Sequence, residues 1–335
     1  MILAGHRTAL RLAVLSAPVF AALLAAFAFG PYPLSPAEAL AALWAGPSAV
    51  NDAATVVWQL RLPRIGAGFL VGAALAAAGA AYQGMFRNPL VSPDILGVSA
   101  GAGLGAALAI YFGLPLAAVQ AIAFVGGLLA VAAVVFVAGR VRRHDPVLVL
   151  VLAGVAVGTL FSAGISLVKV LADPSVQLPS ITFWLLGGLN AVAPADLWLA
   201  APLIGAGLLP MLLLRWRVNL LSLSDEEAAA LGVNVARLRG VLIVSATLMT
   251  AAAVSIAGIV GWIGLVVPHA ARLLVGPEFS RLLPAALLLG GGFLVAADTL
   301  ARSAAAIELP LGILTALVGA PVFLWLLARS GRSGT

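Results

Sequence analysis

Side chains capable of acid–base or nucleophilic chemistry are few in this sequence and lie far apart. The three histidines are His6, His144 and His269, and no H-E-x-x-H metal-binding motif occurs. Residues 97–101 read GVSAG, which matches the letters of the G-x-S-x-G nucleophile motif. This stretch stands at an expected helix start, where glycines serve a turn and close packing, and we expect no histidine or aspartate partner for its serine. Hydrolytic catalysis is therefore not expected.

The only lysine, Lys169, excludes one route of nucleotide hydrolysis. A phosphate-binding P-loop, G-x-x-x-x-G-K-[ST], needs a lysine directly after a glycine, whereas Lys169 follows Val168 and every other basic residue is an arginine. ATP and its Mg²⁺ must then be held by another chain, and we expect this chain to bind no cofactor of its own. The absence of cysteine also excludes disulfides and cysteine-based metal or redox chemistry.

Ionisable residues inside apolar stretches are the remaining chemical candidates, because charge within a membrane is costly. They are His269, which follows Pro268, together with Asp298 and Glu308. A proton or sodium relay needs several carboxylates grouped near the membrane midplane, and the sequence shows none grouped there. We expect His269 to be a hydrogen-bonded structural residue, and Asp298 is spaced to pair with Arg302 four residues later.

Three hydroxyl residues, Thr159, Ser162 and Ser166, recur at i, i+3 and i+7 and so share one helix face. Two interpretations stay open: these side chains bond neighbouring helices, or they line a path through the membrane. Both interpretations require that the segment be a membrane-spanning helix.

The composition is that of a protein that crosses the membrane many times. Of the 335 residues, 63% are hydrophobic and 9% are charged, against about 25% charged residues in a soluble domain. The basic residues occur in short clusters between apolar runs, so they indicate orientation rather than nucleic-acid binding. The run from Leu12 to Phe29, after Arg7 and Arg11, is longer than the apolar core of a signal peptide, and we expect it to be the first span.

Apolar runs of about 20 residues are long enough to cross a bilayer. The candidates are 10–30, 61–84, 115–138, 147–170, 194–214, 282–302, 309–328 and a shorter run at 96–112. Residues 240–271 are too many for one upright helix and few for two. Two passes there, in 240–260 and 262–275, bring the total to ten and place both chain ends on one side of the membrane.

With ten spans, fourteen of the 18 basic residues fall on the side of the N-terminus. The four on the other side are Arg61, Arg64, Arg302 and Lys169. The positive-inside rule then places both termini in the cytoplasm. The three arginines at the outer ends of helices either snorkel to the interface or form a positively charged rim that receives an acidic partner.

Two loops carry helix-capping signals. A short outer helix is expected at 35–46, because it opens on the capping pattern SPAE and closes on a glycine. In the cytoplasmic loop LSLSDEEAAALGVNVARLRG, Ser224 caps a helix, Glu227 occupies the capping-box position and Gly232 ends the helix. A solvated linker would not need two capping signals, so we expect this second loop to be a contact surface.

Several stretches of the chain resemble one known family. They are RLPR at 61–64, QGMFRNPLVSPDILGVSAGAGLG at 83–105, DEEAAALGV at 225–233, GLVVPHAARLLVG at 264–276, ADTLAR at 297–302 and ELPLGILTALVGAPVFLWLL at 308–327. In this order and spacing they look like the iron-chelate and vitamin B12 ABC importer permeases, often called FecCD or BtuC-type permeases. The resemblance covers almost the whole chain.

The resemblance implies an all-α polytopic membrane protein with the BtuC-like fold of type II ABC importers. About ten transmembrane helices with inverted repeats then form one permease domain over residues 1–335. The resemblance further implies a homodimer with its path on the dimer axis, two ABC ATPase subunits on the cytoplasmic face and a periplasmic substrate-binding protein on the outer face. The chain is then a multi-pass translocation subunit of a bacterial inner membrane, not an enzyme.

Site residues are implied position by position. Arg61, Arg64 and Arg302 match arginines that receive acidic residues of the binding protein. Loop 222–234 matches the coupling helix that lies in a groove of the ATPase. Its candidate residues are Ser224, Asp225, Glu226, Glu227, Ala228, Leu231 and Gly232.

Other positions match the gates and the path of this family. Asn88, Pro89 and Leu90 match a cytoplasmic loop, and Arg142, Arg143 and His144 fall in the cytoplasmic gate. Residues 172–192 match the outer gate, beside which Lys169 either meets an anionic chelate or snorkels. The candidate path consists of Thr159, Ser162, Ser166 and Lys169.

We therefore expect a permease that takes a metal chelate from its binding protein to the cytoplasm by alternating access. An iron–siderophore complex or haem is the expected cargo, ahead of cobalamin. The alternative function is an ion-coupled secondary transporter of a small organic solute, which would need a carboxylate site at the midplane. A membrane enzyme would need a polar cluster within the spans.

Overall fold

The computed structural model describes residues 2–49, 51–141, 146–304 and 307–330, and this part of the chain is helical without a β-strand. Six helical segments in it are long and apolar enough to cross a membrane. They are Asp52–Met85, which ends in α4 (Leu62–Met85), α6 (Leu116–Arg140), α7 (Pro146–Leu171), α9 (Pro194–Leu213), α12 (Val235–Ala257) and α14 (Phe279–Ala301). Four further helices have shorter apolar stretches: α1 (Ile2–Ala28), α5 (Val98–Tyr111), α13 (Ile263–Val275) and α15 (Leu311–Ser330). The all-α polytopic fold expected from the sequence is confirmed.

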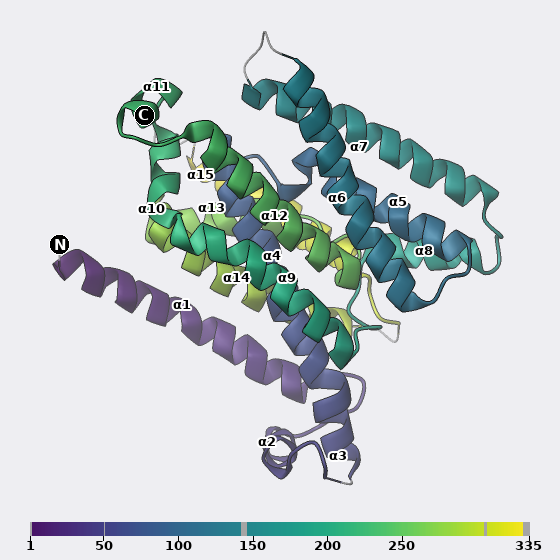
Figure 1. Ribbon diagram of the computed structural model, residues 1–335. Coiled ribbons are helices and arrows are strands. Elements are labelled where there is room, and N and C mark those ends of the chain that lie inside the picture. Colours follow the sequence, from purple (N-terminus) through teal and green to yellow (C-terminus); the bar gives the residue numbers. More distant parts are fainter. Residues whose placement is uncertain (1, 50, 142–145, 305–306, 331–335) are drawn as a thin grey trace.

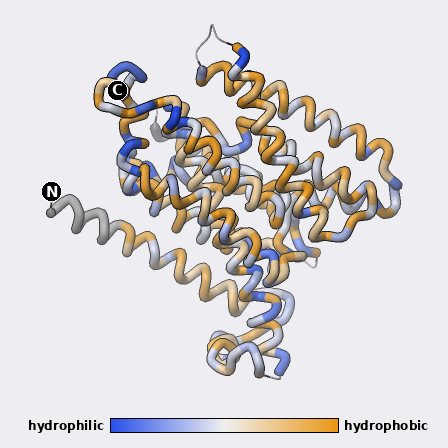
Figure 2. Tube along the Cα trace, viewed as in Figure 1, coloured by the Kyte–Doolittle hydropathy of each residue, from blue (hydrophilic) through white to orange (hydrophobic). Residues whose placement is uncertain are grey.

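The bundle has two ends, which we call the α11 face and the α2 face. The α11 face carries α11 (Asp225–Ala230), and α1 begins and α15 ends there (Figure 1). The α2 face carries α2 (Pro36–Ala45), α3 (Asp52–Thr55) and α8 (Gln177–Leu186). Figure 2 shows apolar residues along the helices between the two faces and hydrophilic residues mainly at the ends. This distribution is what a bundle surrounded by lipid requires.

Helix α4 forms the centre of the bundle and packs along α14, α12 and α13. Nearly every residue in its second half is buried, and most of these are alanine or glycine. Small residues let helix backbones approach closely in a membrane, where close packing replaces the hydrophobic driving force. At the crossing of α4 and α14, a Cβ on Gly72 would overlap the carbonyl oxygen of Gly290, and the reverse also holds.

The long apolar region 240–271 is divided into two helices, as expected. Helix α12 ends at Ala257 and α13 begins at Ile263. Between them the backbone enters the left-handed region at Gly258 (φ +65°) and at Trp262 (φ +70°). Glycine adopts that conformation at little cost, so the break lies where the chain can turn.

The region before α4 differs from the expectation that a span begins at residue 61. The helix starts at Asp52, and residues Val56–Arg61 form a π-helix, η1. The N–H of Leu62 bonds to the carbonyl of Val57, five residues back. Pro63 explains the wide turn, because it has no N–H to donate and its ring clashes with a carbonyl of the preceding turn.

Short elements complete the loops. They are the 3₁₀-helices η2 (Pro93–Leu96) and η3 (Asn219–Ser222) and the four-residue helix α10 (Arg215–Val218). The capping box expected for the helix at the α2 face is formed, because Ser35 accepts from the N–H of Glu38 and the Glu38 carboxylate accepts from the N–H of Ser35. The equivalent box at the other face joins Ser224 and Glu227.

Candidate functional site

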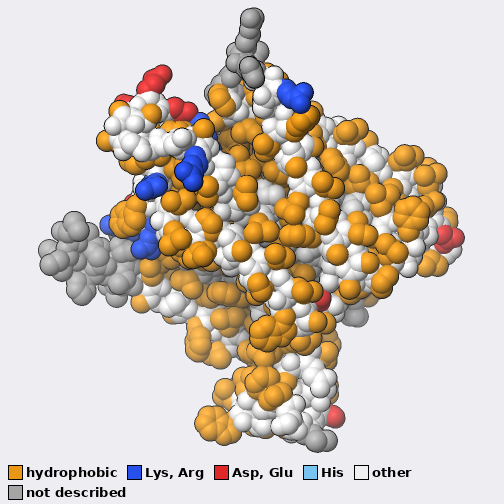
Figure 3. All heavy atoms as spheres, in the orientation of Figure 1, with side chains coloured by type: hydrophobic (Ala, Val, Ile, Leu, Met, Phe, Trp, Pro, Cys, Tyr) orange, Lys and Arg blue, Asp and Glu red, His pale blue; other side chains and the backbone are white. Residues whose placement is uncertain are grey.

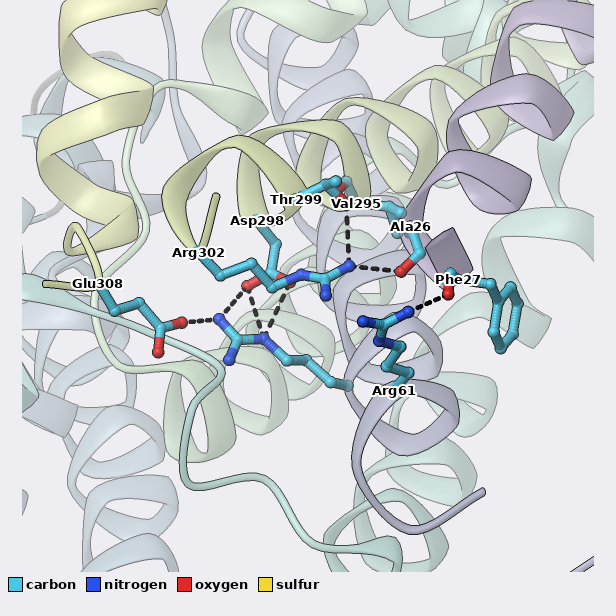
Figure 4. Close-up of polar contacts among 9 residues, drawn as sticks. Ala26, Phe27, Arg61, Val295, Asp298, Thr299, Arg302 and Glu308 are labelled. Atoms are coloured by element: carbon cyan, nitrogen blue, oxygen red, sulfur yellow. Dashed lines mark hydrogen bonds and ion pairs between the residues drawn. The ribbon is translucent and has the colours of Figure 1, made fainter. Parts of the chain in front are cut away.

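Five charged side chains meet at the α2 face, and we call them the arginine cluster: Arg61, Arg64, Asp298, Arg302 and Glu308. Arg61 is the last residue of η1 and Arg64 lies in the first turn of α4. Asp298 is in the last turn of α14, Arg302 caps that helix, and Glu308 precedes α15. Figure 4 shows Arg61, Asp298, Arg302 and Glu308 converging from three parts of the chain. The three arginines that charge counting assigned to one side of the membrane therefore lie together.

Arg64 is held by two carboxylates. Its Nε lies 3.0 and 2.9 Å from the two oxygens of Asp298, and its Nη2 lies 2.7 Å from Oδ1. Nη2 also donates to Oε1 of Glu308. The Asp298 side chain is 3% exposed and that of Glu308 is 35% exposed. A bidentate pair with a buried acid is among the strongest polar contacts a protein makes, so Asp298 fixes Arg64.

Arg61 and Arg302 bind the end of α1. Arg61 donates to the carbonyls of Phe27 and Tyr32, and Nη2 of Arg302 donates to the carbonyl of Ala26 at 2.5 Å. The last carbonyls of a helix have no partner within it and carry partial negative charge. These two guanidinium groups therefore cap α1, which ends at Ala28.

The expected pair between Asp298 and Arg302 is present but weak. Nε of Arg302 lies 3.5 Å from Oδ2 of Asp298, and this Nε has no hydrogen bond within the described residues. Asp298 bonds to Arg64 instead, which lies 234 residues away in sequence.

Exposure separates the members of the cluster. Arg61 is 4% exposed and Arg302 is 7% exposed, whereas the side chain of Arg64 is 16% exposed. A molecule approaching the α2 face can therefore reach Arg64 and Glu308 with less rearrangement than the other members require.

The loop at the α11 face is organised around Asp225. Its carboxylate accepts from Arg239 at the start of α12 and from Nη2 of Arg87 after the end of α4. Arg87 also donates to the carbonyl of Leu221, at 2.7 Å. The hydrogen bond from Arg239 is the largest cause that lowers the pKa of Asp225 below its ordinary value. The sequence indicated a capped helix here but not this connection.

The other residues of the loop divide into buried and exposed. Ala228 is buried, and Gly232 ends the turn with a φ of +81°. Glu226 is exposed, and Leu231 is 61% exposed. Hydrogen bonds from the backbone and hydroxyl of Ser224 lower the pKa of Glu227. Figure 3 shows acidic side chains over α11 with basic ones beside it. The side of the bundle in this view is otherwise largely apolar.

The turn after α4 is exposed and held by Asn88. The N–H of Leu90 donates to Oδ1 of Asn88 at 2.9 Å, and Pro89 lies between them. Arg142, Arg143 and His144, which the resemblance assigned to a gate, lie outside the described residues.

The hydroxyl stripe of α7 shows no bond to a neighbouring helix within the described residues. Thr159 donates to the carbonyl of Val155 at 2.8 Å, and Ser166 donates to the carbonyl of Ser162 at 3.1 Å, both within the same helix. Thr159, Ser162 and Ser166 are exposed on the single chain, and Lys169 in the last turn is half-buried. The interpretation as a path therefore stays open, and bonding to neighbouring helices is not seen in the described part of the chain.

Two expectations about single residues were wrong. His269 has no hydrogen bond on either ring nitrogen within the described residues, and its ring packs edge-on against Phe323 instead. Ser99 does have an acidic partner, because its hydroxyl donates to Asp94, five residues earlier. Asp94 lies in η2 and Ser99 in the first turn of α5, so the bond holds the turn between these two elements.

A cavity of about 540 Å³ lies beside α8 at the α2 face. Ser180, Phe183 and Trp184 of α8 line it together with Ser255 and the stretch 307–311. Glu308 thus belongs to the arginine cluster and to the lining of this cavity. No pattern in the sequence indicates this cavity, because the residues around it come from five separate segments.

Residues 18–329 of this chain match the model of the FecCD transport family. The molybdate import system permease protein MolB of Haemophilus influenzae is 39% identical and covers 91% of this chain and of its own length. The hemin transport system permease protein HmuU of Yersinia pestis is 39% identical over 86% of this chain and 88% of its own. A solved structure of a metal-chelate type ABC transporter in an inward-facing conformation has a TM-score of 0.85 at 37% identity, covering 95% of this chain and 98% of that one.

Proposed function

This chain belongs to the FecCD transport family, and we propose that it is the permease subunit of an ATP-binding cassette importer for a metal chelate. The observation that carries the proposal is the likeness, over 95% of the chain, to a metal-chelate type ABC transporter. Apolar helices packed around a buried α4 supply the membrane body of such a subunit. The energy comes from ATP bound with Mg²⁺ on a separate ATPase, since the sequence has no P-loop lysine.

In this proposal the protein lies in a bacterial inner membrane, with the α11 face in the cytoplasm and the α2 face in the periplasm. The support is the positive-inside rule, because the division of the sequence into ten spans puts fourteen of the 18 basic residues on the side of the N-terminus, and α1 begins at the α11 face. Two chains form a homodimer, and the exposed stripe of Thr159, Ser162 and Ser166 lines the path between them, with Lys169 at its end.

Orientation can be tested directly because the chain has no cysteine. Trp44 on α2 is 95% exposed and Leu231 beside α11 is 61% exposed. In intact cells stripped of their outer membrane, a membrane-impermeant maleimide should label the Trp44→Cys chain and leave the Leu231→Cys chain unlabelled. Labelling only of Leu231→Cys would invert the proposed orientation.

A periplasmic substrate-binding protein docks on the arginine cluster through acidic side chains. The cluster holds three guanidinium groups and two carboxylates, so it carries one net positive charge, and complementary charge speeds encounter and fixes the register of docking. Arg64 makes the first contact because it is the most exposed of the three. Replacing it by Arg64→Glu should abolish stimulation of ATP hydrolysis by the binding protein. The control is Arg281→Glu, which replaces a half-buried, ion-paired arginine at the other face.

The ATPase binds at the α11 face, with Glu226 and Leu231 as its contacts on this chain. An exposed leucine on a short capped helix is suited to a hydrophobic groove on a partner. The turn at Asn88, Pro89 and Leu90 lies on the same face, and Arg87 next to it contacts Asp225. Movement of the ATPase is thereby passed to α4 and α12.

The proposal as a whole is tested by isolation from native membranes. The tagged chain is extracted gently, and mass spectrometry identifies the proteins that accompany it. A P-loop ATPase in equal amount supports the assignment as an importer. The substrate-binding protein whose gene lies next to that of the ATPase is then tested for binding of iron–siderophore complexes, haem, cobalamin and molybdate. A preparation of this chain alone that performs ion-driven counterflow would overturn the proposal in favour of a secondary transporter.

A further inference from the structure

Glu308 connects the arginine cluster to helix α8. Its carboxylate binds Nη2 of Arg64, and three residues later the N–H of Leu311 donates to the carbonyl of Gly187 at 2.9 Å. Gly187 is the residue that ends α8. Only the stretch 308–311 therefore separates an ion pair at the surface from the end of a helix in the interior of the α2 face.

Of the two acids on Arg64, Glu308 is the one that can leave. Asp298 accepts at both oxygens from Nε and Nη2 of Arg64 and is almost fully buried. Glu308 makes one contact to the same guanidinium from a side chain that is 35% exposed. Ion pairs open to solvent contribute little net stability, so a competing carboxylate displaces Glu308 while Asp298 remains bound.

Helix α8 is anchored on one side and has open space on the other. Ile181 is fully buried in a cluster with Ala107, Val168 and Ala172. On the opposite side lies the cavity of about 540 Å³, lined by Ser180 and Trp184 of α8 and by residues 307–311. Protein interiors are otherwise close-packed and resist displacement. The cavity gives α8 and residues 307–311 room to move relative to each other.

We propose that Glu308 is a positioning residue. It transmits to α8 whether a carboxylate of a partner is bound to Arg64. The inference rests on the proposed docking of an acidic partner at the arginine cluster. A carboxylate of that partner takes the edge of Arg64 that Glu308 contacts, and Glu308 is released. Residues 307–311 then shift, the bond between Leu311 and Gly187 carries the shift to α8, and the cavity opens.

The test uses the accessibility of the cavity in the complete transporter, reconstituted in lipid nanodiscs. Ser255 lines the cavity and is 8% exposed, and Ser255→Cys provides a single thiol in a chain that has no other. The rate at which a maleimide modifies this thiol reports how open the cavity is. In the otherwise native chain we expect slow modification that the binding protein accelerates several-fold.

Glu308→Gln removes the charge and keeps the shape of the side chain. We expect this variant to be modified several-fold faster without the binding protein, and the binding protein to add nothing further. Arg64→Gln removes the other partner and should give the same fast rate, which keeps the test valid if one variant folds poorly. Asp52→Asn is the control, because it removes an exposed carboxylate of α3 that belongs to a different part of the α2 face.

Two failures are distinguishable. If Glu308→Gln is modified at the native rate and still responds to the binding protein, the link through Glu308 is wrong and the docking proposal stands. If the binding protein fails to bind the native transporter, the docking proposal is wrong. The rate of thiol modification measured without binding protein then tests the coupling through Glu308 by itself. An unchanged rate in Glu308→Gln overturns that coupling.

Discussion

Asp225 accepts hydrogen bonds from both terminal nitrogens of Arg239, at 2.7 and 2.8 Å, while Arg87 reaches the same carboxylate at 3.0 Å. One side chain thus ties α11 to the start of α12 and to the end of α4. Each of these pairs would contribute little alone, because Asp225 is half exposed. Together they fix the direction in which a short helix can move.

Replacing Asp225 by asparagine should uncouple transport from ATP hydrolysis. Asp225→Asn keeps the size of the side chain but removes the charge that both arginines bind, so α11 can move without carrying α4 and α12. We expect substrate uptake per ATP hydrolysed to fall several-fold while the ATPase stays bound. The control is Glu278→Gln, which removes another ion-paired carboxylate at the α11 face. Equal loss in both variants would mean that Asp225 has no special role.

The attachment of α11 should depend on pH only in the acidic range. The pKa of Asp225 lies below its ordinary value of 3.8, chiefly because of the hydrogen bond from Arg239. A lowered carboxyl pKa adds stability that is fully present above the unfolded-state pKa and is lost as the pH falls through the folded-state pKa. Hydrogen exchange of the α11 amides should therefore be protected equally from neutral pH to about pH 5 and lose protection only below the ordinary pKa of an aspartate. A loss of protection near pH 6 would contradict this assignment.

Arg61 should matter for stability more than for docking. Arg61→Gln withdraws a charged donor from the last carbonyls of α1, and a hydrogen bond to a charged group contributes about 1.5–3 kcal/mol. We expect a lower midpoint of thermal unfolding in detergent and a small change in the Kd for the binding protein, since Arg61 is 4% exposed. Normal thermal stability combined with lost docking would show that Arg61 contacts the partner directly.

The crossing of α4 and α14 should tolerate no side chain. In Gly290→Ala the added Cβ meets the carbonyl of Gly72 and the Cβ of Ala76, and overpacking of this kind costs about 1–3 kcal/mol. Thermal unfolding of the purified protein should report the loss. Gly205→Ala in α9 is the matched control, because a Cβ there meets nothing within 4 Å, and it should be neutral or slightly stabilising. If the two variants unfold alike, the close approach is not what holds these helices together.

The arrangement of the helices could be predicted from the sequence because it depends on local patterns. Apolar run length identified the spans, and the balance of basic residues required a division in 240–271 that the structure places at Gly258. Capping residues located the short helices at both faces. The same balance predicted that Arg61, Arg64 and Arg302 lie at one end of the bundle.

The partners of these side chains could not be predicted in the same way. Arg302 bonds to the carbonyl of Ala26, 276 residues away in sequence, and no periodicity connects two such positions. Spacing favoured a pair between Asp298 and Arg302, yet Arg64 has the better geometry and takes the carboxylate. His269 was expected to have a hydrogen bond because buried imidazoles usually do, but an aromatic ring occupies the space beside it.

The π-helix before α4 has a consequence for how members of this family can diverge. Such a turn holds one residue more than an ordinary helical turn while covering nearly the same rotation. Losing one residue between Val56 and Leu60 would therefore restore an α-helix and leave the elements before it, including α2, nearly where they are. Arg61 and Arg64 lie after the deletion and would keep their places, and the end of α1 would keep the two arginines that cap it. A single-residue deletion at this point can thus be absorbed without disturbing the arginines.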